Sequence, residues 1–402
     1  MMNLRRRFVN LVAENCMSSV CSLHRLDVSQ RLFYPSTAEA EAAKPTIYRL
    51  SLPPPTYNFQ PAVVGRNVEQ HLFGLANPRI SESRILWRSQ EGNTFLYDAD
   101  SHTAWSMPNG LRYKGYGPIV ISAPVPVDDA DADADADSAP GEQEDLFVMC
   151  SNSGYPSFQV LRFDHSKPKP FNPRTFTDAD PSWEWNSLPP PPVSEGSSIY
   201  THAVLDGGRV ICVSASPFGG TYLFDTVGRE WMRQATSDWH MPFLGAPQYV
   251  PDLKLWLGVS WSGDEDDSDR HHLCASSDLG GAVDAATRGE YRPSVTVTHH
   301  WKEGLETPVG WNTASAELLD LGEGRFCIAK IIYEVVKDDY PEYQNSVGKT
   351  AALLTGVEMV RGAGDGCSSN PSSSSSSEEG FRMVVHKSLR YIFRRESINW
   401  VL

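Results

Sequence analysis

The chain has 402 residues, of which 40% are hydrophobic and 21% are charged, an ordinary composition for a globular protein with a buried core. Its formal net charge of −15 argues against nucleic acid or an anionic membrane as the primary partner, because both require a basic protein surface. A single core rarely exceeds roughly 250–300 residues, so this length indicates several domains or one repeat architecture.

The N-terminal segment predicts a β-strand rather than a targeting sequence. The apolar run from Phe8 to Ala13 is interrupted by Asn10 and ends at Glu14. It therefore falls short of the roughly 7–15 apolar residues that a signal peptide needs, and an organellar transit peptide is kept as the alternative. No run of about 18 apolar residues occurs, so we expect no transmembrane helix.

One sequence unit recurs along the chain. It consists of an apolar run ending in Asp, a polar turn, an aromatic residue that opens the return strand, and then a Pro-containing stretch. The clearest copies are 94–108 and 221–231, and weaker copies occur at 23–33, 160–189 and 273–308. Such a unit predicts a β-hairpin. Its key residues are Asp27, Phe33, Asp98, Trp105, Asp164, Trp185, Asp225 and Trp231.

Each residue type in the unit has a physical role. The Asp side chain can accept hydrogen bonds from backbone amides two residues further on, which fixes the turn. The aromatic side chain is expected to pack between neighbouring sheets, where its large area contributes most. We therefore expect Trp105, Trp185 and Trp231 to occupy equivalent positions.

A second β-rich run precedes each hairpin, so each unit contains four strands. These runs are residues 84–87, 146–150, 209–213, 253–259 and 325–332. Four strands make one propeller blade, so the sequence predicts a single all-β propeller over residues 1–402. The final unit has good strands at 351–360 and 381–393 but lacks the Asp–Trp pattern. The six predicted blades span approximately 1–55, 56–110, 111–192, 193–243, 244–310 and 311–402.

The hairpin pattern resembles the second half of a kelch repeat, and FDTVGREW at 224–231 is the best match. The chain also resembles a grass-enriched plant family known only as domain of unknown function 1668. The segments that carry this resemblance are RRFVNLVAEN, LHRLDVSQRLFYPSTAEAEAA, LPPPP, GRFCIAK, LTGVEMVRG and the final WVL. The resemblance implies a kelch-like, galactose-oxidase-type propeller and supplies no activity.

Two segments interrupt the propeller pattern. Residues 128–137 read DDADADADAD, and 372–377 are an unbroken serine run followed by two glutamates. Like charges repel, and neither Ala nor Ser can bury enough apolar surface to fold. We therefore expect disordered inserts at approximately 128–142 and 362–380.

The cysteines favour a reducing compartment. There are seven, an odd number, and none forms a Cys-x-x-Cys pair. Cys150, Cys212 and Cys327 each lie in an apolar run, which is typical of buried thiols. We therefore expect a cytoplasmic or nuclear protein with reduced cysteines.

No catalytic pattern occurs in the sequence. It contains no Gly-x-Ser-x-Gly elbow and no phosphate-binding Gly-rich loop. The pairs His271-His272 and His299-His300 could each contribute one ring to a common point, but no third metal ligand is evident. We therefore expect no catalytic residue, no metal site and no cofactor.

Two functions of different classes are compatible with these observations. The first is a non-catalytic protein-interaction scaffold or adaptor, a monomer that binds a protein partner through its loops. The second is a small-molecule or glycan-binding propeller, or an enzyme, that uses the central channel. Apolar side chains at exposed loop tips would favour the first function, whereas a charged funnel at the channel mouth would favour the second.

Overall fold

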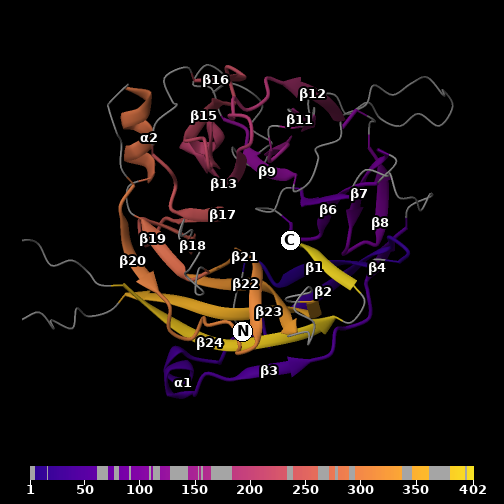
Figure 1. Cartoon of the computed structure of the whole chain (residues 1–402), viewed down its shortest axis with the longest axis vertical. Helices are drawn as coiled ribbons and strands as arrows, with labels where there is room; N and C mark the ends of the chain where they lie inside the picture. Colours follow the sequence, from indigo (N-terminus) through magenta and orange to yellow (C-terminus); the bar gives the residue numbers. More distant parts are fainter. Residues whose placement is uncertain are drawn as a thin grey trace, which may run out of the picture.

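The computed structural model describes residues 5–15, 17–60, 71–76, 81–89, 92–107, 110–111, 118–126, 144–152, 154, 157–163, 183–232, 239–260, 271–276, 279–288, 295–336, 346–361, 381–393 and 396–402. Its β-sheets stand side by side around a common centre, as in a β-propeller (Figure 1). The fold is therefore all-β.

Three sheets of this ring have four strands each. The first contains β25 (Glu396–Val401), β1 (Phe8–Asn15), β2 (Cys21–Asp27) and β4 (Tyr57–Phe59). The second contains β5 (Leu72–Leu75), β6 (Arg84–Arg88), β7 (Thr94–Asp98) and β8 (Thr103–Ser106). The third contains β9 (Ile119–Pro124), β10 (Glu144–Met149), β11 (Phe158–Phe163) and β12 (Trp183–Leu188).

The next sheet has eight strands, in two halves of four. One half contains β13 (Ser198–Leu205), β14 (Val210–Ser216), β15 (Thr221–Asp225) and β16 (Glu230–Trp231). The other half contains β17 (Phe243–Val250), β18 (Leu255–Ser260), β19 (Leu273–Ser276) and β20 (Val297–Trp301). A single parallel pairing, Thr201 with Gly245, joins the two halves.

The last sheet has five strands, and four of them are the longest in the ring. It contains β21 (Trp311–Gly322), β22 (Arg325–Val336), β23 (Ser346–Arg361), β24 (Phe381–Phe393) and β3 (Ile47–Leu50). Helix α1 (Thr37–Ala42) and the 3₁₀ turn η1 (Asp206–Gly208) are short, and α2 (Leu279–Thr287) follows β19. Neither α-helix among the described residues is long and apolar enough to cross a membrane.

The β-rich runs predicted from the sequence form the second strand of their sheets. They correspond to β6, β10, β14, β18 and β22, and each is flanked by antiparallel partners. These strands are apolar on both faces because a sheet within the ring has a neighbour on each side. Continuous apolar runs therefore mark the buried centre of each sheet.

Apolar clusters fill the junctions between adjacent sheets all the way around the ring. Val12 of the first sheet packs with Phe73 of the second, and Leu86 of the second packs with Val148 of the third. At the opposite junction, Leu11 packs with Cys327 of the five-stranded sheet, which closes the circle. The core is therefore a series of inter-sheet layers rather than one central mass, which is how a repeat fold exceeds the size limit of a single core.

The first and last predicted units need correction. Residues 396–401 were expected in the last blade, but β25 pairs with β1 and so belongs to the first sheet. The return strand after Asp27 was expected to open at Phe33, but it is β4, which begins at Tyr57. The intervening chain instead places α1 and β3 against the five-stranded sheet, where β3 pairs with β24.

The acidic tract at 128–137, the shorter acidic run at 263–269 and the serine-rich insert at 362–380 lie outside the described residues.

Candidate functional site

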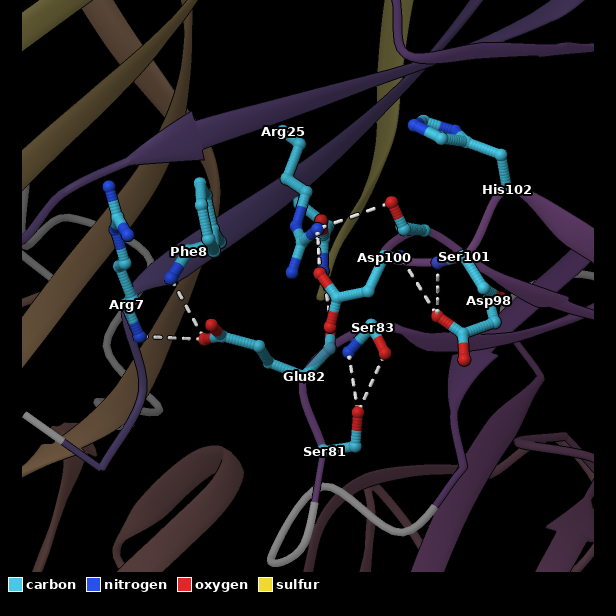
Figure 2. A network of polar contacts seen from close by, with 12 residues as sticks. Arg7, Phe8, Arg25, Ser81, Glu82, Ser83, Asp98, Asp100, Ser101 and His102 are labelled. Carbon is cyan, nitrogen blue, oxygen red and sulfur yellow. Dashed lines mark hydrogen bonds and ion pairs between the residues drawn. The ribbon is translucent and has the colours of Figure 1, made fainter.

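The predicted turn aspartates form the expected hydrogen bonds. Asp98 Oδ1 accepts from the backbone N–H of Asp100 at 2.8 Å (Figure 2). Asp225 Oδ1 accepts from the N–H of Val227 at 2.9 Å, and Asp27 Oδ1 accepts from that of Ser29 at 3.1 Å. Each carboxylate thus fixes a turn at the end of its strand. Asp164 lies outside the described residues.

The aromatic residues of the pattern do not all occupy equivalent positions. Trp231 packs in the junction toward the third sheet, and Trp185 packs in the junction between the second and third sheets. Both therefore face the preceding sheet, and so does Phe33, which is buried although it lies on no strand. Trp105 is the exception, because its side chain is 47% exposed. The expectation that Trp105 packs like Trp231 was wrong.

A polar cluster joins the first and second sheets (Figure 2). The carboxylate of Glu82 accepts from the backbone N–H groups of Arg7 at 2.7 Å and Phe8 at 2.8 Å. Arg25 covers the Phe8 ring at 4.0 Å and forms an ion pair of 2.5 Å with Asp100. These groups bind one another across the junction between the two sheets. The cluster therefore has a structural role, which is to hold the N-terminal strand against the second sheet.

The sequence reasoning missed Glu82 and Arg25. No local pattern marks them, because their partners lie far away in the chain.

The two histidine pairs contribute one ring each to a common point. His272 Nε2 and His300 Nδ1 are 2.9 Å apart, and His272 Nδ1 lies 3.0 Å from Ser260 Oγ. Within the described part of the chain, no group of three or more His, Cys, Asp or Glu side chains is placed to hold a metal ion. The contact is therefore a hydrogen-bonded row from Ser260 on β18, through His272 just before β19, to His300 on β20.

Two ionisable side chains lie on inner strands of the ring, His202 on β13 and Glu317 on β21. Burial lowers the pKa of His202 to about 4 and raises the pKa of Glu317 to about 7. In both cases the cause is desolvation, which favours the uncharged form. At neutral pH His202 is therefore uncharged, whereas Glu317 is only partly ionised.

One pocket lies between the third sheet and the hairpin β15–β16. It has a volume of about 230 Å³ and is lined by Pro124, Phe147, Asp145, Arg162 and Arg229, among others. Arg162 Nε donates to Asp145 Oδ2 at 2.8 Å. Burial nevertheless raises the pKa of Asp145 and outweighs the attraction of Arg162 and Arg229. The pocket is small beside the roughly 300–1,000 Å³ of typical ligand sites.

The most exposed large apolar side chains lie at one end of the ring. Met17 is 86% exposed, Phe218 is 70% exposed and Val309 is fully exposed. Met17 and Phe218 lie in the β1–β2 and β14–β15 connections, and Val309 lies between β20 and β21. Successive strands of a sheet run in opposite directions from the centre of the ring outward. The connection between the second and third strands of a sheet therefore lies at the same end of the ring as the connection from a fourth strand to the next sheet. We call it the Phe218 end.

The described cysteines behave as buried apolar residues. Cys21, Cys150, Cys212, Cys274 and Cys327 are all buried thiols outside any disulfide. Burial raises the pKa of Cys212, Cys274 and Cys327, so their thiols are poor nucleophiles at neutral pH. Cys16 and Cys367 lie outside the described residues.

Comparison with solved structures gives only remote likenesses. Hydrazine synthase of Kuenenia stuttgartiensis is 13% identical with a TM-score of 0.35, covering 74% of this chain and 66% of that one, just under two thirds. The β-propeller domain of Cps50 (Swd1) from Myceliophteria thermophila is 8% identical with a TM-score of 0.34, covering 86% of this chain and 89% of that one.

The WD40 domain of SCAP from fission yeast is 9% identical with a TM-score of 0.29, covering 96% of this chain and 88% of that one. Scores of this size carry no argument, so the propeller assignment rests on the ring of sheets itself.

Family membership comes from the sequence. No curated protein matches the chain. The model of the family described as "Protein of unknown function (DUF1668)" matches residues 6–391, which is nearly the whole chain. The chain therefore belongs to this family.

Proposed function

We propose that this protein is a non-catalytic interaction scaffold, a monomeric six-bladed kelch-like propeller of the cytosol or nucleus that binds a protein partner at its Phe218 end. The supporting observation is the exposure there of Met17, Phe218 and Val309. Large apolar side chains held in water at loop tips gain free energy when a partner buries them. Phe and Met are both enriched in protein interfaces relative to the rest of the surface.

Phe218 is the best-supported anchor because a hydrogen bond and a tight turn order its backbone. Its N–H donates to Ser197 Oγ at 3.0 Å, and Ser197 is buried. Gly219 follows, where a Cβ would lie 2.8 Å from the carbonyl oxygen of Ala215, so the turn is tight. A loop whose backbone is already ordered loses less conformational entropy on binding, which favours affinity.

The test compares partner recovery for matched variants. The tagged full-length protein is purified from its own cells, and stoichiometric partners are quantified by mass spectrometry. Phe218→Ser should abolish recovery of at least one such partner, whereas Val227→Ser, at the opposite end, should retain it. Identical partner lists for both variants, or no stoichiometric partner at all, would contradict the proposal.

The pocket beside Arg162 supports the alternative, a small-molecule or glycan-binding propeller or an enzyme. Its two arginines and one buried carboxyl group converge in the manner of a ligand site. A screen of carboxylated metabolites and sugars by thermal shift would support this alternative if one compound stabilises the wild type but not Arg162→Gln. The small volume of the pocket makes it the weaker of the two proposals.

A further inference from the structure

The outer edge of the five-stranded sheet is formed by β3, a strand that lies outside the ring's four-strand pattern (Figure 1). Its inner edge pairs with β24, and no described strand pairs with its outer edge. Ile47 and Tyr48 are 38% and 42% exposed, so the strand is open to solvent. An open edge presents unpaired N–H and C=O groups that can accept another strand.

Two arginines lie side by side at this edge. Arg49 of β3 is in register with Arg390 of β24, so their side chains share one face of the sheet. Like charges directly opposite each other destabilise a sheet unless something neutralises them. Among the described residues, neither guanidinium has a hydrogen bond or ion pair. The nearby Arg49 contributes to lowering the pKa of Arg390, after the larger effect of burial.

Arg390 is held in place without a polar partner. The residue is only 6% exposed, and its guanidinium lies over the Trp311 ring at 5.3 Å. Its Nε is enclosed and has no hydrogen-bond acceptor within the described part of the chain. An enclosed guanidinium nitrogen without an acceptor costs free energy, and an anion bound to the exposed side of the guanidinium would offset part of that cost.

The other charges on this part of the sheet do not neutralise the pair. Glu334 raises the pKa of Arg390 from a distance, but its carboxylate lies 3.6 Å from Lys349 Nζ. Among the residues that the structure describes here, Arg49, Arg390 and Lys349 thus lie near one carboxylate, that of Glu334. The local surface is basic, although the whole chain carries a net charge of −15.

We propose that Arg49, Arg390 and Trp311 form an anion-recognition site beside the open edge of β3, and that its occupant is an extended acidic segment of a protein partner. The segment adds a strand to β3 through its backbone, and one of its carboxylates binds between the two guanidinium groups. This inference rests on the proposed scaffold function and names the chemistry of a partner.

The site also lies close to the Phe218 end. Trp311 begins β21 two residues after the exposed Val309, and β24 runs toward that same end. A second copy of this chain would bring further arginines to the same edge, so charge complementarity favours an acidic partner over self-association.

A fluorescent peptide of alternating Glu and Val provides the probe, and fluorescence polarisation measures its affinity for the full chain. Arg49→Gln and Arg390→Met should each weaken binding at least tenfold. Arg382→Gln is the matched control, because Arg382 lies on the same strand but is paired with Glu41. It should change the affinity less than twofold.

Two modified peptides separate strand addition from simple charge attraction. A peptide with Gln in place of Glu should lose binding, because the carboxylate is missing. A peptide with alternate backbone amides N-methylated should also lose binding, because it cannot pair with β3. If the N-methylated peptide binds as well as the parent, or if Arg382→Gln weakens binding as much as Arg49→Gln, the proposal is wrong.

Stability measurements distinguish loss of the binding site from loss of the fold in the arginine variants. Arg390→Met removes an enclosed polar group without a partner, so its denaturation midpoint should equal or exceed that of the wild type. If that variant does not fold, Arg49→Gln still tests the site, because Arg49 is exposed. Inorganic phosphate that raises the melting temperature without being displaced by the peptide would identify a free-anion site and overturn the proposal.

Concentration-dependent dimers in sedimentation, abolished by Arg49→Gln, would assign the edge to a second copy instead. The scaffold proposal would be unaffected by any of these failures if Phe218→Ser still abolished partner recovery.

Discussion

Hairpins β7–β8 and β15–β16 carry the same residue pattern, yet they place its aromatic residue differently. Both begin with Asp at the end of a strand, and both turns are fixed by that carboxylate. Trp231 packs against Phe158 and Phe224, whereas Trp105 is 47% exposed. Identical turn chemistry therefore does not guarantee identical packing of the next aromatic residue.

The difference arises from a spacing of one residue. Trp105 follows Asp98 by seven positions, and Trp231 follows Asp225 by six. Asp98 pairs with Thr103 and Asp225 with Glu230, so the turns have equal length. Trp105 then lies opposite Leu96, two residues before the Asp, and Trp231 lies opposite Phe224, one residue before it. Because strand side chains alternate, the two indoles lie on opposite faces.

The largest expected effect is on Trp231. Truncation to Ala removes a ring that packs between sheets and donates from Nε1 to the carbonyl oxygen of Pro189 at 2.9 Å. We expect Trp231→Ala to lower the free energy of unfolding by about 2–4 kcal/mol, somewhat below the value for a fully buried Trp. Trp105→Ala should lower it by less than about 1 kcal/mol. Urea denaturation monitored by circular dichroism measures both.

Equal losses for the two tryptophan variants would contradict the register argument. Trp185→Ala sharpens the comparison, because Trp185 also faces the preceding sheet and should resemble Trp231.

An intermediate effect is expected for the aspartates, and here the two hairpins should agree. Asp98→Ala and Asp225→Ala each remove an acceptor used by two backbone N–H groups of the turn. We expect each to cost about 1–2 kcal/mol in unfolding free energy. The two Asp variants should differ less in unfolding free energy than Trp105→Ala and Trp231→Ala do. If they differ more, the turns, rather than the faces on which the tryptophans lie, distinguish the two hairpins.

The sequence allowed the β-rich runs, the hairpins and the turn aspartates to be predicted, because each depends on neighbours within a few residues. The faces of the tryptophans could not be predicted, since a one-residue change in spacing reverses the face while the pattern looks unchanged. The position of β3 was also missed. Its four residues, IYRL, become a strand of the five-stranded sheet by pairing with β24, which lies more than 330 residues away in the sequence.

The candidate sites were less predictable than the fold. Phe218 and Val309 are ordinary apolar residues in the sequence, and only the folded chain reveals that they are exposed. The Arg49–Arg390 pair likewise depends on the register between two distant strands. Notably, a basic surface was not expected here, because the net charge of a chain does not describe its local distribution.

The smallest effect concerns the response of Asp98 to pH. Burial disfavours its ionised form, but hydrogen bonds from Asp100, Ser83 and Ser101 and the charge of Arg84 outweigh burial, so its pKa lies below the ordinary value. A carboxyl group whose pKa is lower in the folded state contributes stability that is present above the pKa of the unfolded chain, about 3.9. That contribution is lost as the pH falls through the lower folded-state pKa.

Asp98→Asn should therefore differ from the wild type in unfolding free energy by a constant amount between about pH 5 and 8, with the difference shrinking below about pH 4. Because the turn is near the surface, solvent limits the change to roughly 0.5 kcal/mol or less. Urea titrations at pH 3, 4, 5 and 7 measure it. Trp105→Ala is the control, since it removes no titrating group and should run parallel to the wild type. A difference between Asp98→Asn and wild type that is as large at pH 3 as at pH 7 would mean that the charge of Asp98 does not stabilise its turn.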